Sequence, residues 1–180
     1  MAKTVELWDV LDADGNKTGR FHERGKWLNP GDYHLVVHVW IKNSRGEFLI
    51  SKRTPNKIFP NLWECTGGSA VAGDDSITAA MREVREELGI VLEPTSGRLF
   101  KHHKKDFCGI CGIGDGSGHF VDVWLFCHEM DIGEVVLQPN ETCDAMWASE
   151  AQIRQLIDDE AFVPPEKCFP YLDELFREVL

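Results

Sequence analysis

Two periods of hydrophobic and polar residues run along this chain and predict its secondary structure. Strand-like segments, rich in Val and aromatic residues, fall at 5–11, 18–22, 33–41, 47–52, 99–107, 119–127 and 143–148. Apolar residues recur at helical spacing in 76–88, 151–157 and 170–179. Strands dominate the first half, and helices follow in a mixed order. This order predicts one compact α/β domain in which helices flank a mixed sheet.

Turn and capping residues mark where these elements begin and end. A turn-rich stretch at 12–16 separates the first two strands, which predicts an N-terminal β-hairpin within a strand extension over residues 1–30. Gly89 suits the C-terminal end of the helix at 76–88, and the candidate N-caps are Asp74, Asp75 and Ser76. The segment 160–180 is expected to form a C-terminal helix.

Composition and charge narrow the class of protein. The 180 residues suffice for one domain, and 19 Lys and Arg against 30 Asp and Glu give a formal charge of −11. Such a chain repels nucleic-acid backbones and anionic membranes, so neither is an expected partner. No apolar run is long enough for a membrane helix, and the N-terminus does not resemble a signal peptide. A cytoplasmic protein with reduced cysteines is therefore expected.

Three glutamates cluster on one face of the helix predicted at 76–88. Glu83, Glu86 and Glu87 have the spacing i, i+3, i+4, which places their Cβ atoms about 5–6 Å apart. Carboxylates this close repel one another unless a cation lies between them, and Mg²⁺ prefers oxygen ligands. A solvated face balanced by arginines is the alternative interpretation.

Two glycines upstream of this helix favour the metal interpretation over the solvated face. Gly67 and Gly68 allow a close backbone approach or a sharp turn just where the helix begins. A glycine pair followed by a carboxylate-rich helix is therefore a candidate active site, with the glycines beside the substrate.

The same segment resembles the signature of the Nudix hydrolases over residues 67–90. Asp74 stands where that family usually has Glu, which keeps the charge but shortens the reach. The resemblance implies a single Nudix domain over 1–180, with an α/β/α sandwich fold and a mixed sheet. The positions that match in register are Gly68, Arg82, Glu83, Val84, Glu86, Glu87, Gly89 and Ile90.

The resemblance implies metal-assisted attack of water on a diphosphate linkage in a nucleoside diphosphate derivative or another small organic diphosphate. Glu83, Glu86 and Glu87 are then the ligands of Mg²⁺ or Mn²⁺, and Glu86 is the best candidate for the base. Arg82 is expected to orient a glutamate. Glu141 is the candidate for a further acid from a later loop, and a solvated loop acid is its alternative.

Two cations at the end of the strand at 47–52 are candidates for phosphate binding. Arg53 is favoured over Lys52 because its planar fork matches phosphate oxygens. Both residues are equally compatible with simple exposure at a strand end.

The upstream region also resembles the isopentenyl-diphosphate isomerases. His34 matches a metal-binding histidine of those enzymes. However, Gly67 stands where they carry the catalytic cysteine, Ser69 replaces a second metal-binding histidine, and Cys65 is expected to point elsewhere. Hydrolysis is therefore favoured, with an isomerase-like enzyme or a catalytically silent ligand-binding domain as alternatives.

Oligomeric state and one cysteine loop stay open at this stage. A homodimer is compatible with the resemblance, since similar proteins are often dimers. Cys108 and Cys111 form a lone CxxC motif, for which incidental thiols in a flexible loop are the default and a zinc or redox site is the minority interpretation.

Overall fold

The computed structural model describes residues 5–105 and 118–179, so the prediction for Cys108 and Cys111 lies outside the described residues. Its helices are α1 (Ser76–Leu88), α2 (Glu150–Asp158), α3 (Pro165–Cys168) and α4 (Leu172–Val179). Its strands are β1 (Leu7–Leu11), β2 (Lys17–Glu23), β3 (Tyr33–Lys42), β4 (Phe48–Arg53), β5 (Trp63–Glu64), β6 (Thr66–Ser69), β7 (Gly97–Lys105), β8 (Gly118–Cys127) and β9 (Thr142–Ala148). None of the described helices has both the length and the apolar character needed to span a membrane.

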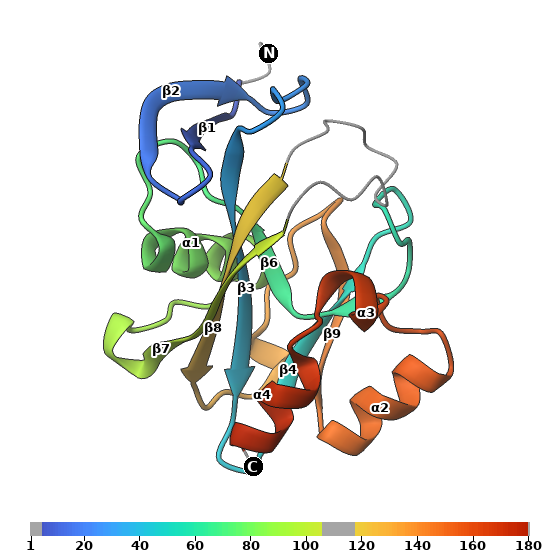
Figure 1. Cartoon of the computed structure of the whole chain (residues 1–180). Helices are drawn as coiled ribbons and strands as arrows, with labels where there is room; N and C mark the ends of the chain where they lie inside the picture. Colours follow the sequence, from blue (N-terminus) through green and yellow to red (C-terminus); the bar gives the residue numbers. More distant parts are fainter. Residues whose placement is uncertain (1–4, 106–117, 180) are drawn as a thin grey trace.

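Strand β3 is the centre of the sheet. It runs parallel to β8 along its whole length and antiparallel to β1, β4 and β6. Parallel and antiparallel pairs therefore share one sheet, which confirms the predicted mixed sheet. Figure 1 shows α1 on one side of the sheet and α2 and α4 on the other, which is the expected α/β/α sandwich.

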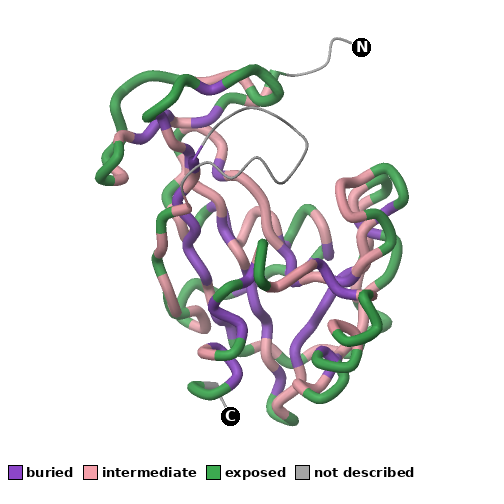
Figure 2. Tube along the Cα trace, turned by 45° about the vertical axis from the view of Figure 1, so that its right-hand side comes forward, coloured by how far each residue is buried: buried purple, intermediate pink, exposed green. Residues whose placement is uncertain are grey.

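Alternate residues of β3 supply two separate hydrophobic cores, because successive side chains of a strand point to opposite faces. Val37, Val39 and Ile41 pack with the apolar stripe of α1. Trp40 packs on the opposite face with residues of α2 and α4. Figure 2 shows the resulting distribution, with buried segments inside the sandwich and an exposed N-terminal hairpin. The strand that carries both cores is also the strand against which the candidate site is built.

Local sequence signals place the boundaries of α1 where they were predicted. The Asp75 side chain accepts a hydrogen bond from the Thr78 N–H and caps the helix. Gly89 ends the helix with a left-handed φ of 72°. The predicted hairpin is confirmed as well, since β1 and β2 pair antiparallel around a turn in which the Asp12 carboxylate accepts the Asn16 N–H.

Two expectations about secondary structure differ from the observed fold. The segment 160–180 is not one helix, because α3 ends at Cys168 and a break precedes α4. Phe169 adopts a non-helical backbone, as residues before a proline usually do, and Pro170 follows it. Strand β6 was not predicted, since two glycines in four residues weaken the strand signal.

Candidate active site at the glycine strand and helix α1

The floor of the site is formed where β6 runs between β3 and α1. Gly67 pairs with His38 and Gly68 with Val37 in the antiparallel ladder. A Cβ atom on Gly67 would overlap the Val37 carbonyl oxygen. One on Gly68 would lie 2.5 Å from the Glu83 carboxyl carbon and 2.6 Å from its oxygens. Both glycines are therefore needed for close approach, the first to β3 and the second to a carboxylate of α1.

Arg82 connects the acidic residues of this region. Its Nε donates to Asp74 Oδ2 at 3.0 Å, and its Nη1 donates to Glu83 Oε1 at 2.8 Å and to Glu86 Oε2 at 3.1 Å. Its Nη2 donates to the Ser69 carbonyl oxygen at 3.0 Å, which ties α1 to β6. The guanidinium thus positions two of the predicted metal ligands, while the shorter side chain of Asp74 still reaches the arginine.

The acidic residues experience different degrees of burial. Burial, with the neighbouring carboxylates of Glu64 and Glu83, raises the pKa of Glu87 to about 8. Burial likewise raises the pKa values of Glu83 and Glu64, although Arg82 and Arg53 respectively oppose these shifts. Glu86 is the most exposed of the three glutamates on α1, since its side chain is 50% exposed.

This donor chemistry fits a hard divalent cation, because desolvated carboxylates held together are stabilised by positive charge between them. Within residues 5–105 and 118–179, no three acidic, His or Cys side chains already form a metal centre. Glu83 and Glu86 both form ion pairs with Arg82 in this arrangement.

The two candidate phosphate-binding cations lie in different environments. The Arg53 guanidinium pairs with Glu64 and also donates to the Ile58 carbonyl oxygen, so its fork is largely engaged within the protein. Lys52 lies over the Trp63 ring, with its Nζ 5.6 Å from the ring centroid. Consecutive strand residues point to opposite faces, so only Arg53 lines the cavity described below.

Glu141 lies close to the site and is paired there with a lysine that the sequence did not indicate. Its carboxylate pairs with Lys57, whose pKa is lowered by burial and by the nearby charge of Arg53. The same segment contacts α1, because the Gln138 N–H donates to the Glu87 carbonyl oxygen at 3.0 Å. A single lysine in a loop forms no motif, so nothing in its local sequence indicates this position.

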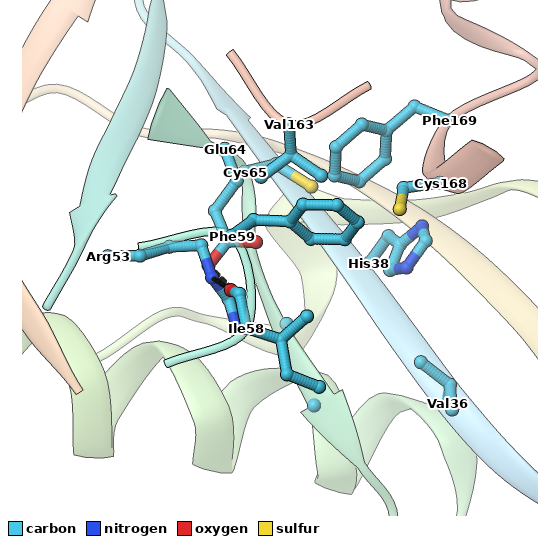
Figure 3. Close-up of a pocket in the computed structure, with 12 residues that line it drawn as sticks. Val36, His38, Arg53, Ile58, Phe59, Glu64, Cys65, Val163, Cys168 and Phe169 are labelled. Carbon is cyan, nitrogen blue, oxygen red and sulfur yellow. Dashed lines mark hydrogen bonds and ion pairs between the residues drawn. The ribbon is translucent and has the colours of Figure 1, made fainter. Parts of the chain in front are cut away.

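A cavity of about 210 Å³ opens beside the acidic region (Figure 3). Arg53, Glu64, Gly67 and Gly68 line its polar end. Its remaining walls are mostly apolar, with His38, Cys65 and Cys168 as the other polar or sulfur-containing groups; the apolar residues are Val36, Ile58, Phe59, Val163 and Phe169.

The expectation that Cys65 points elsewhere was wrong. Cys65 and Gly67 both line the cavity, because residues two apart in an extended chain face the same side. Burial nevertheless raises the pKa of the Cys65 thiol well above its ordinary value, so the reactive thiolate form is suppressed. His34, the other position shared with the isomerases, is buried and stacks on Trp8 at a ring separation of 4.2 Å.

Comparison with known proteins yields consistent relatives. The NUDIX domain family model matches residues 32–168. An uncharacterized Nudix hydrolase of Listeria monocytogenes is 34% identical over 176 residues, which cover 96% of this chain and 95% of that protein. An isopentenyl-diphosphate delta-isomerase of Halorhodospira halophila is 30% identical over 99 residues, which cover 54% of this chain and 57% of that enzyme. The crystal structure of DR0079 from Deinococcus radiodurans shares the fold with a TM-score of 0.70 and 21% identity, covering 97% of this chain and 99% of that one.

Proposed function

This chain belongs to the Nudix family, as a pyrophosphohydrolase, and from that premise we propose that it hydrolyses a diphosphate linkage in a nucleoside diphosphate derivative or another small organic diphosphate. The observation that carries the proposal is the arrangement at the end of α1. The desolvated carboxylate of Glu83 lies against Gly68 of the glycine strand, and that of Glu87 interacts with Glu64, which lines the polar end of an otherwise apolar cavity.

Glu83, Glu86 and Glu87 are the proposed ligands of the metal, and Mg²⁺ or Mn²⁺ is the proposed ion. When bound, such an ion supplies Lewis-acid polarisation of the phosphate oxygens and neutralises charge that develops on them. Arg82 holds Glu83 and Glu86 through one nitrogen, so these two carboxylates remain close to each other before any ligand binds.

Of these three glutamates, Glu86 is the one proposed to serve instead as the general base, or to assist it. Its side chain is the most exposed of the three glutamates, and its bond to Arg82 is on the exposed surface of the helix. A carboxylate that can turn between a guanidinium and water is suited to accept the proton of the attacking water. Glu141, held beside the site by Lys57, is the second acid that can take this part.

Arg53 is the proposed phosphate contact, because it lines the cavity at its polar end next to Gly67 and Gly68. Its ion pair with Glu64 fixes the direction of the guanidinium. Lys52 is less suited to this role, since its Nζ lies over the ring of Trp63.

An isomerase-like enzyme is the second candidate, favoured by the partial similarity to the Halorhodospira enzyme. The site lacks two residues that the isomerases use. Gly67 replaces the catalytic cysteine, and Ser69 replaces the histidine ligand. The buried Cys65 thiol has a raised pKa and does not substitute for a reactive cysteine.

The test is a product-resolved assay over nucleoside and prenyl diphosphates with Mg²⁺ or Mn²⁺. We expect phosphate-bond cleavage that falls by a factor of about 100 or more in Glu86→Gln and Glu87→Gln while circular dichroism stays unchanged. Glu93→Gln, at an exposed glutamate outside the site, is the matched control. Double-bond migration without cleavage would establish the isomerase, and wild-type rates in both variants would remove the acidic helix from the mechanism.

Two further expectations belong with this proposal. Location in the cytoplasm and assembly as a homodimer are consistent with the family, and light scattering coupled to size-exclusion chromatography measures the second. A monomeric mass at micromolar concentration would contradict it.

A further inference from the structure

Among the described residues that line the cavity, His38 is the one imidazole. It lies on β3 beside Gly67, and its ring packs edge-on against Phe169 at 5.0 Å. Figure 3 shows this ring among Val36, Cys168 and Phe169, in a wall that is otherwise apolar or weakly polar. Which of its two nitrogens carries the proton therefore decides what the cavity offers to a ligand.

Tyr171 determines which nitrogen of His38 carries the proton, because its buried hydroxyl has three neighbours. Trp40 Nε1 lies 3.1 Å away and His38 Nδ1 lies 2.8 Å away, while the Cys65 thiol is the third partner. A tyrosine hydroxyl has one proton and two acceptor lone pairs. The Trp40 N–H can only donate, so it occupies one lone pair. His38 Nδ1 and the Cys65 sulfur are then the two groups that can accept the hydroxyl proton.

The proton goes to His38. An imidazole nitrogen is a strong acceptor, whereas a thiol sulfur is a weak one, so Tyr171 donates its proton to Nδ1. The imidazole then carries its own proton on Nε2, which lies on the side of the ring away from Nδ1. Tyr171 is the only hydrogen-bond partner of this ring in the described part of the chain.

The ring also stays neutral. Burial lowers the pKa of His38 to about 3, and the positive charges of His119, His103 and Lys105 act in the same direction. A neutral ring with its Nδ1 already bonded offers one hydrogen-bond donor, Nε2–H, and no positive charge. It therefore suits an uncharged acceptor atom better than a phosphate group.

We propose that His38 is a substrate-binding residue whose Nε2–H donates a hydrogen bond to the organic group of the substrate. This inference rests on the proposed function and narrows its substrate class to nucleoside diphosphate derivatives. A heterocycle or sugar supplies an acceptor atom, and its ring packs against aromatic walls. A hydrocarbon chain would fill the same walls but leave the N–H unpaired, which disfavours it.

The loop opposite His38 is built to present an aromatic ring. Phe59 has a φ of 55°, in the left-handed region that bulky side chains rarely adopt. Its ring lines the cavity opposite the β3 wall (Figure 3). Backbone strain of this kind clusters at ligand sites, because the surrounding structure has to hold it. The strained Phe59 and the oriented His38 thus belong to the same cavity.

The first test compares ADP with dimethylallyl diphosphate by titration calorimetry in the presence of Mg²⁺. His38→Leu removes the donor and keeps the bulk, and we expect it to weaken ADP binding by a factor of about 10 to 100. Binding of dimethylallyl diphosphate should change by less than about twofold, because it offers no acceptor there. His38→Gln restores an N–H donor and should recover part of the ADP affinity. His128→Leu, at a histidine that does not line the cavity, is the matched control.

The second test determines which nitrogen of His38 carries the proton. Two-bond ¹⁵N–¹H correlation spectra of the histidines should show His38 as the Nε2–H tautomer, and Tyr171→Phe should increase the Nδ1–H form. An Nδ1–H tautomer in the wild-type protein, or equal ADP affinity in wild type and His38→Leu, overturns the inference. Absence of turnover on every diphosphate, with ADP binding still dependent on His38, would instead reject the proposed function alone.

Discussion

Replacing Gly68 by alanine separates the packing of the site from its chemistry. Neither Gly68 nor Gly67 has a positive φ, so alanine is compatible with both backbone conformations. The three atoms nearest the new methyl group at position 68 all belong to the Glu83 carboxylate, whose carbon would lie 2.5 Å away. At position 67 the methyl group would meet the Val37 carbonyl oxygen, which belongs to β3. Gly67→Ala is therefore the matched control for Gly68→Ala.

The expected magnitudes follow from what has to move. Non-bonded carbon atoms prefer separations of about 3.5–4.0 Å, so the Glu83 carboxylate must retreat by about 1 Å in Gly68→Ala. A displacement of that size at a catalytic group costs a factor of about 100 in rate. Since the moving group is the end of a flexible side chain, the free energy of unfolding should change by less than about 1 kcal/mol. The rigid backbone contact in Gly67→Ala should instead lower it by about 1–3 kcal/mol.

Two measurements on each variant test the expected changes in stability and rate. Urea unfolding followed by tryptophan fluorescence gives the free energy of unfolding, and steady-state turnover of the best diphosphate substrate at saturating Mg²⁺ gives kcat. We expect a stable but slow Gly68→Ala and a destabilised Gly67→Ala. The reasoning is refuted if Gly68→Ala retains full kcat, or if it unfolds as readily as Gly67→Ala.

Three other predictions concern the surrounding side chains. Arg82→Lys replaces the planar guanidinium by a single ammonium group, which cannot hold Asp74, Glu83 and Glu86 together. We therefore expect kcat to fall about 10- to 100-fold with the fold retained, and an unchanged kcat contradicts this expectation. Because the folded-state pKa of His38 is lowered to about 3, its contribution to stability is complete above pH 6.5 and is lost as the pH falls toward 3. His38→Leu should therefore reduce the acid-side slope of unfolding free energy, by up to about 1.4 kcal/mol per pH unit, and parallel curves in urea titrations at pH 7, 6 and 5 would exclude the assignment. Phe59→Gly relieves the left-handed φ and removes an aromatic wall of the cavity. We expect KM for ADP-type substrates to rise while the midpoint of thermal unfolding changes little. A large drop in that midpoint would indicate that the ring has a purely structural role.

Helix α1 shows what can be predicted from sequence alone. Its boundaries depend on Asp75 and Gly89, which act within one turn of the residues they cap. The relation of Glu83 to Glu86 and Glu87 depends only on helical spacing. Such local interactions are readable because the partners lie a few residues apart, and they carry the family resemblance as well.

The cavity depends on contacts that no local pattern reveals. His38 and Tyr171 are 133 positions apart in sequence, yet their side chains share a hydrogen bond. Lys57 and Glu141 come from separate loops, and Phe59 is placed by an unusual backbone angle. Because such pairs form only when the sheet and its two helical layers assemble, the sequence predicts the proposed catalytic helix more fully than the wall proposed to contact the substrate.

The position of β3 has a consequence for how the protein opens. This strand has hydrogen-bonded neighbours on both edges and a hydrophobic core on both faces. Its amide protons should therefore exchange with solvent only through global unfolding. The residues of β6 are bonded directly to it, so the glycine floor shares that protection. The walls contributed by Phe59 and its loop lie outside this ladder, so their amide protons should exchange faster than those of the glycine floor.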